Sequence, residues 1–293
     1  MNSAPELKIL SLNDNLITDI SPVSKLDNLT QLYMSSNNIS DLRPLSQLTT
    51  LKQLSLRSNR IVDLSPLTDL VGLELLDLSD NEISKLEPLS GMAGLRGLNL
   101  AVNRVSNLQV LSGLLNLKWL DLSYNNILDI VPLATLKGLW GLMLDANFIS
   151  DVSPLIGYTE LGADYLPEWG ALQTSEYRLC LGLSFNQIAS VRELLYAGLG
   201  EGDAINIAGN SLNVESIDKY VRAIRDDGVK VFDKMPDFYT EMNVEEPPVV
   251  MHTLVGRGTC RNCHDVAGVE LLLDFKTHAR FDSPVCLQCH RTP

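Results

Sequence analysis

The fold is decided by the stretch LKILSLNDNLITDISP at residues 7–22. Its pattern returns every 22 residues, with an asparagine at the same place and no insertion or deletion through the seventh copy. The repeated asparagines are Asn15, Asn37, Asn59, Asn81, Asn103, Asn125 and Asn147. Self-similarity at a fixed period indicates stacked structural units, each too small to bury its apolar side alone.

The letters of the repeat have physical roles. Leu10 and Leu12 alternate along a short strand, so both are expected to point into the stack. Asn15 follows where the strand turns away, and its amide can bond backbone groups of the neighbouring coil and form a ladder. Pro22 fixes the backbone on the convex side, where a short 3-10 or extended segment replaces a full helix.

The pattern L-x-x-L-x-L-x-x-N-x-[IL] resembles the leucine-rich repeat, and its D-[IL]-x-P-L continuation resembles bacterial internalin-like repeats. The resemblance covers roughly residues 7–233 and implies an α/β fold: a leucine-rich-repeat solenoid with short strands and a 3-10 or extended convex side. We therefore predict a solenoid with a C-terminal cap over residues 1–233, a linker over 234–250 and a small loop-rich module over 251–293.

The repeat is interrupted once. After Asn147 the next ladder asparagine is Asn186, 39 residues on instead of 22. The extra residues fall within about 156–177 and include Tyr165 and Trp169. Inserted loops in solenoids often carry contacts, so two interpretations stay open: a folded-back surface loop, or a segment that packs on the C-terminal module.

The end of the solenoid reads as a cap. Residues 214–227 predict an amphipathic helix whose apolar face comprises Val214, Ile217, Val221 and Ile224. Gly228 is expected to end this helix, and residues 229–232 to form a closing strand. At the other end only six residues precede the first repeat, which predicts a bare strand edge and stacking face.

Chemistry gathers in the tail. Four of the five cysteines and all four histidines fall within the last 42 residues. Two C-x-x-C-H motifs stand there, formed by Cys260, Cys263 and His264 and by Cys286, Cys289 and His290. In this motif both thiols add to the vinyl groups of one haem, and the adjacent histidine becomes the proximal iron ligand. The tail therefore predicts two haem c groups.

The remaining histidines complete two bis-histidine sites, because His252 and His278 are left for the distal positions. The spacing does not assign either to one haem, and donation between subunits is an open alternative. The segment FKTH at 275–278 resembles those before haem motifs in multihaem cytochromes. Six-coordinate iron leaves no site for a substrate, which favours an electron carrier over an enzyme.

A second hypothesis accounts for the same cysteines with zinc. Cys260, Cys263, Cys286 and Cys289 match the C-x2-C…C-x2-C spacing of a tetrahedral structural ion. This interpretation makes the chain a leucine-rich-repeat protein-interaction protein with a zinc module, but it leaves four histidines unexplained. Two structural disulfides are a third alternative.

Charge and hydropathy limit the partners. A net charge of −13 and a pI of about 4.7 argue against nucleic acid, and no stretch predicts a membrane span. Haem attachment through thiols occurs outside the cytoplasm, so we expect an exported protein (periplasm, cell surface or extracellular), although no signal segment is visible. Expected partners are redox proteins, and the bare first repeat suggests head-to-tail self-assembly into an extracellular filament.

One cysteine lies apart from the tail. Cys180 aligns with Ile9, Gln31 and Trp119 of the repeat, which predicts a partly covered thiol on the concave strand face; an intermolecular disulfide is the alternative. The same face is expected to display Tyr33, Arg57, Trp119, Asp121 and Met143, a mixed surface to which the sequence assigns no role.

Overall fold

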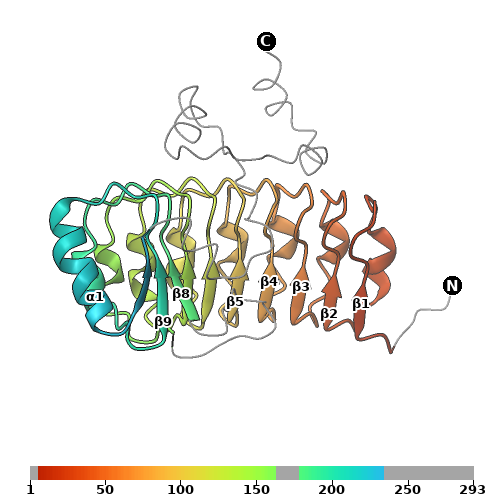
Figure 1. Ribbon diagram of the computed structural model, residues 1–293. Helices are drawn as coiled ribbons and strands as arrows, with labels where there is room; N and C mark the ends of the chain where they lie inside the picture. Colours follow the sequence, from red (N-terminus) through yellow and green to blue (C-terminus); the bar gives the residue numbers. More distant parts are fainter. Residues whose placement is uncertain (1–5, 163–177, 234–293) are drawn as a thin grey trace, which may run out of the picture. The chain divides into compact units, whose positions relative to one another are not determined.

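A computed structural model describes residues 6–162 and 178–233. In these residues one parallel sheet holds ten short strands in chain order (Figure 1). The strands are β1 Ile9–Ser11, β2 Gln31–Tyr33, β3 Gln53–Ser55, β4 Leu75–Asp77, β5 Gly97–Asn99, β6 Trp119–Asp121, β7 Gly141–Met143, β8 Arg178–Gly182, β9 Asp203–Asn206 and β10 Lys230–Phe232. The predicted leucine-rich-repeat solenoid is confirmed.

Tight 3-10 turns follow β1 to β8, and six of the eight carry a proline in their first turn, as predicted. They are η1 Ser21–Lys25, η2 Arg43–Leu45, η3 Ser65–Leu67, η4 Glu87–Leu89, η5 Gln109–Gly113, η6 Val131–Thr135, η7 Ser153–Leu155 and η9 Arg192–Tyr196. Proline occupies the first turn of η1, for example, because its missing N–H is not needed there.

The core is a column of leucines between the sheet and the turns. From β2 to β7 the central residue of each strand is buried, and Leu98, Leu120 and Leu142 have no exposed surface. Residues one repeat apart pair across neighbouring strands, so Leu98 pairs with Leu120 and Leu120 with Leu142. Stacking therefore buries in every coil the face that one coil alone would expose.

The predicted asparagine ladder is confirmed in detail. The Asn125 amide donates to the carbonyls of Leu100, Leu122 and Ser123 at 2.9, 3.0 and 3.2 Å. Its oxygen accepts the Val105 N–H at 2.8 Å. One side chain thus satisfies backbone groups of its own coil and of the preceding one, while remaining fully buried.

The C-terminal cap corrects part of the prediction. A π-helical segment η10, Ser216–Val221, leads into α1, Arg222–Asp226, at the end of the sheet opposite β1 (Figure 1). Val221 and Ile224 are buried, but Val214 is 73% and Ile217 49% exposed. The wider π turn puts Ser216, Tyr220 and Val221 on the inner face and rotates Ile217 to its edge.

Two predicted regions lie outside the described residues. The inserted segment is described only to residue 162, and the linker and the C-terminal module follow residue 233. At the first coil Leu10 and Leu12 stay partly exposed, whereas their counterparts Leu32 and Met34 are fully buried. Within residues 6–162 and 178–233 no helix is long and apolar enough to cross a membrane.

Candidate functional site

None of the predicted cofactor residues can be placed. The four motif cysteines Cys260, Cys263, Cys286 and Cys289 and the histidines His252, His264, His278 and His290 lie outside the described residues. In the part of the chain that is described, no cluster of three or more His, Cys, Asp or Glu could hold a metal ion. The haem and zinc predictions therefore stay predictions.

The described candidate is the open face of the sheet, formed in β1–β7 by the first and third residues of each strand and by the residue two positions after the third. These side chains point away from the leucine core because alternate residues of a strand face opposite sides. Toward β1 this face is polar and bonded within itself. The Tyr33 hydroxyl donates to Gln53 Oε1 at 2.7 Å, and the hydroxyls of Ser35 and Ser55 lie 2.7 Å apart.

Toward the middle the open face is acidic. Asp77, Asp121 and Asp145 are partly buried, and each carboxylate accepts a backbone N–H: from Ser79 at 3.0 Å, Ser123 at 2.9 Å and Ser184 at 2.8 Å. Burial raises the pKa of Asp77, and the positive charge of Arg57 opposes this rise.

Burial raises the pKa of all three carboxyl groups. For Asp121 desolvation and the charges of Asp145 and Asp77 raise the pKa to about 6, although the Ser123 hydrogen bonds oppose the rise. Desolvation is also the main cause of the raised pKa values of Asp77 and Asp145. Carboxyl groups whose charged form is disfavoured by burial are typical of functional surfaces.

Two glycines shape this acidic region. A Cβ on Gly141 would lie 2.7 Å from the Trp119 ring, so the indole crosses the next strand where that strand has no side chain. A Cβ on Gly182 would meet the Asp145 carboxylate at 2.0 Å. The sequence places Trp119 and Asp121 on this face correctly, but Met143 is only 8% exposed and is therefore largely covered.

Cys180 also differs from its prediction. Its side chain is 2% exposed, rather than partly covered, and Sγ lies 3.4 Å from the Ala204 carbonyl oxygen. The β8–β9 register shifts between Leu179 and Leu181, so Cys180 sits at a bulge. A disulfide to another molecule would require this part of the sheet to open.

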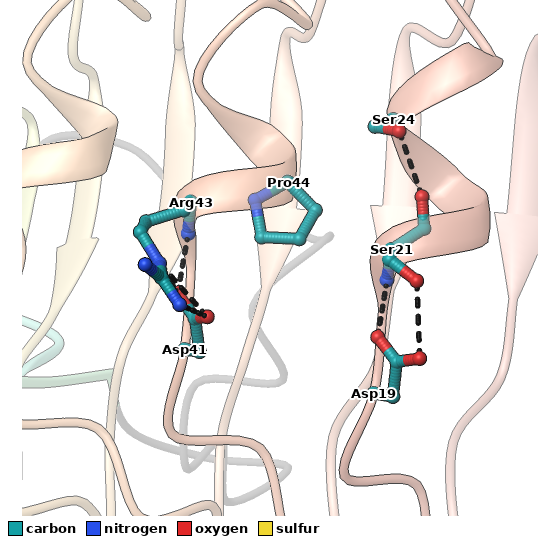
Figure 2. Close-up of a pocket in the computed structure, with 6 residues that line it drawn as sticks. All are labelled: Asp19, Ser21, Ser24, Asp41, Arg43 and Pro44. Carbon is teal, nitrogen blue, oxygen red and sulfur yellow. Dashed lines mark hydrogen bonds and ion pairs between the residues drawn. The ribbon is translucent and has the colours of Figure 1, made fainter.

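A shallow depression lies between the first two 3-10 turns (Figure 2). Its lining residues are Asp19, Ser21, Ser24, Asp41, Arg43 and Pro44. Asp19 accepts the Ser21 N–H at 2.8 Å, which lowers the pKa of Asp19. The Arg43 guanidinium, 2.6 Å from Asp41, lowers the pKa of that carboxyl to about 2.

The same bond recurs in later coils, where Asp63 accepts from Ser65 and Asp151 from Ser153. These aspartates satisfy the first N–H of each turn. The depression is therefore a by-product of capping, and the open sheet face remains the better candidate.

The sequence matches two family patterns of known proteins. Residues 5–47 and 49–91 each match the family described as Leucine Rich repeats (2 copies), and residues 116–137 match Leucine Rich Repeat. No curated protein matches the chain.

Solved structures give further likenesses. An internalin (InlF) from Listeria monocytogenes is 31% identical with a TM-score of 0.64; the match covers 78% of this chain and 61% of that one. Internalin C2 of the same organism is 31% identical with a TM-score of 0.58, covering 67% and 80%. The ectodomain of the Arabidopsis thaliana receptor kinase GASSHO1/SCHENGEN3, solved with CASPARIAN STRIP INTEGRITY FACTOR 2, is 19% identical with a TM-score of 0.61, covering 79% and 27%.

Proposed function

Because the chain belongs to the leucine-rich-repeat family and carries internalin-like repeats, we propose that its solenoid binds a protein partner on the open face of the sheet. The observation that carries this proposal is the shared register of the strands. It lines up the open-face residues of successive coils into continuous rows, so that a partner can contact many coils at once.

The composition of the face suits a protein ligand. It offers hydroxyl and amide groups at Tyr33 and Gln53, an aromatic surface at Trp119 and carboxylates at Asp121 and Asp145. Aromatic side chains beside polar groups are typical of protein interfaces. The plant receptor ectodomain of the same fold was solved in complex with a named factor, which supports a ligand-binding role for the fold.

A steric block tests the proposal. Changing both Ser55→Trp and Asn99→Trp fills the open face without touching the core, because both residues are third in their strands. We expect affinity for the protein that co-purifies with the full chain from its native source to fall at least about tenfold. The measurement is surface plasmon resonance with the purified partner.

The matched control places tryptophan beyond the 3-10 turns, at the exposed Thr68 and Asp69. This variant should bind like the unmodified chain. Equal losses from the two double variants, at equal melting temperatures, would contradict the open face as the binding surface.

The tail motifs favour a second function, electron transfer, which we propose as the role of the C-terminal residues. Four thiols and four imidazoles in two C-x-x-C-H motifs with two further histidines fit two haems completely. Cys260 and Cys263 would hold one haem with His264 as proximal ligand; Cys286 and Cys289 would hold the other with His290. Bound haem would supply one-electron chemistry, and His252 and His278 would close the distal positions.

The two functions fit together in an exported protein. Thioether attachment outside the cytoplasm and the likeness to internalins both support a surface or extracellular location. The solenoid would then hold a redox partner, or subunits would associate head to tail and extend the relay into a filament. The zinc hypothesis would instead make the tail a second interaction module.

Spectroscopy and metal analysis separate haem from zinc. We expect the full chain, purified from its native source, to show an intense Soret band and two haems per chain by pyridine haemochrome assay. Replacing both cysteines of one motif, Cys260→Ala with Cys263→Ala or Cys286→Ala with Cys289→Ala, should remove one covalent haem by intact mass, and Cys180→Ala should remove none. A colourless protein with one zinc per chain would contradict electron transfer but leave the solenoid proposal standing.

A further inference from the structure

The turn that follows each strand has an unusual conformation. In each of eight coils one non-glycine residue there has a φ between +53° and +58°. We call these residues the turn column: Asp14, Ser36, Ser58, Asp80, Val102, Tyr124, Ala146 and Phe185. Left-handed backbone of this kind suits glycine, asparagine and aspartate, whose side chains tolerate it.

The column divides into two halves by chemistry. The first four residues are aspartates and serines, small polar side chains that suit the turn. The next four, Val102, Tyr124, Ala146 and Phe185, are apolar or aromatic, and we call them the ridge. A β-branched valine or a bulky phenylalanine at positive φ is a backbone outlier. Folding alone therefore does not favour Val102, Tyr124 or Phe185 at these positions, and such outliers are common where a surface is used.

Backbone bonds hold the ridge in place. Val102 N–H donates to the Ser123 carbonyl at 2.8 Å, and Ala146 N–H to the Ser184 carbonyl at 2.7 Å. At its end the Phe185 ring lies on the next coil, where a Cβ on Gly209 would be 2.6 Å from the ring. Phe185 is still 36% exposed. The ridge is thus a fixed, partly exposed apolar row.

The ridge borders the acidic part of the open face. Asp145 directly precedes Ala146, and Asp121 lies three residues before Tyr124. Asp121 and Asp145 accept hydrogen bonds from Ser123 and Ser184, and among the described residues neither forms an ion pair. One edge of the sheet therefore combines apolar surface with carboxylates.

We propose that this edge docks a protein segment in which lysine or arginine stands beside bulky apolar residues. The apolar side chains would pack on the ridge, and the cation would lie against Asp121 and Asp145. The inference rests on the proposed protein-binding function and adds the chemistry of the partner. Charge complementarity sets the orientation, and apolar burial supplies most of the affinity.

Three short synthetic peptides test the partner chemistry on the full chain: alternating Leu-Arg, Leu-Glu and Ser-Arg. We expect the Leu-Arg peptide to bind by fluorescence polarisation and the other two to bind at least about tenfold more weakly. Val102→Asn should weaken Leu-Arg binding at least about tenfold while leaving the melting temperature equal or higher, because asparagine suits the turn. Asp121→Asn should weaken it as well.

The control is Ser36→Asn with Ser58→Asn, the same substitution in the polar half of the column, which should leave Leu-Arg binding unchanged. Equal binding of Ser-Arg and Leu-Arg would overturn the proposal in favour of net charge alone. Equal losses in the control would overturn it in favour of the whole turn column. Self-association abolished by Val102→Asn would overturn it in favour of a second copy. If the Ser55→Trp and Asn99→Trp variant loses binding to the native partner and Val102→Asn does not, the ridge proposal is refuted. The proposal that the open face binds a partner is then still supported.

Discussion

Asn125→Ala is expected to lower the free energy of unfolding by about 3–5 kcal/mol and the melting temperature by roughly 10 °C. Alanine removes the amide that bonds three carbonyls in two coils, and it leaves the Val105 N–H without its acceptor. These backbone groups are buried, so water does not replace the lost bonds. Urea unfolding followed by circular dichroism gives the measurement.

The matched control is Asn15→Ala. Within the described part of the chain the Asn15 amide donates to Leu12 and Asn13 of its own coil, and the side chain is exposed. Its replacement should cost less than about 1 kcal/mol. Similar losses at the two positions would mean that the repeated asparagines stabilise single turns and do not tie one coil to the next.

Asp121→Asn is expected to stabilise the protein by about 2–3 kcal/mol at pH 7.5 and to change its stability little at pH 4. The pKa of Asp121 is about 6 in the folded protein, against about 4 when unfolded. Between these values the folded state binds more protons than the unfolded state. The free energy of unfolding therefore falls as the pH rises from about 4 to about 6, and the full penalty is present above pH 6.

Urea unfolding of both proteins between pH 4 and pH 8 tests this sign. Asn keeps an oxygen to accept the Ser123 N–H but carries no charge, so the variant should lose the fall in stability across this window. Asp19→Asn is the matched control, because capping bonds from Ser21 lower the pKa of Asp19. That variant should be less stable than the unmodified chain at pH 7.5. If Asp121→Asn destabilises the protein at neutral pH, the claim that burial disfavours the charged form of Asp121 is contradicted.

Most of the solenoid could be predicted from the sequence because one repeat explains each coil. The ladder role of Asn125 and the 3-10 turn at Pro22 could be predicted because equivalent residues recur in the same role in successive coils. The prediction failed where the repeat ends. The cap helix begins with a π turn that rotates Ile217 outward, and the bulge in β8 buries Cys180. Neither the π turn nor the bulge belongs to the repeated pattern, so the repeat could not predict them.

The open face was predicted only in part. Trp119 and Asp121 were placed on it because strand residues alternate, but alternation does not reveal which carboxylates are partly buried. Asp145 was missed, although its offset from the strand matches that of Arg57, four coils earlier, and of Ser123, one coil earlier. The ridge was missed because positive φ at Val102 and Phe185 contradicts the preferences of those residues.

Photo-crosslinking tests the central claim, that the open face of the sheet is where a partner binds. A benzophenone amino acid is placed singly at Ser55, Asn99, Thr68 or Asp69 in the full chain, and the products with the native partner are identified by mass spectrometry. We predict crosslinks from Ser55 and Asn99 and none from Thr68 or Asp69. Crosslinks that form as readily from the latter two positions would contradict the account.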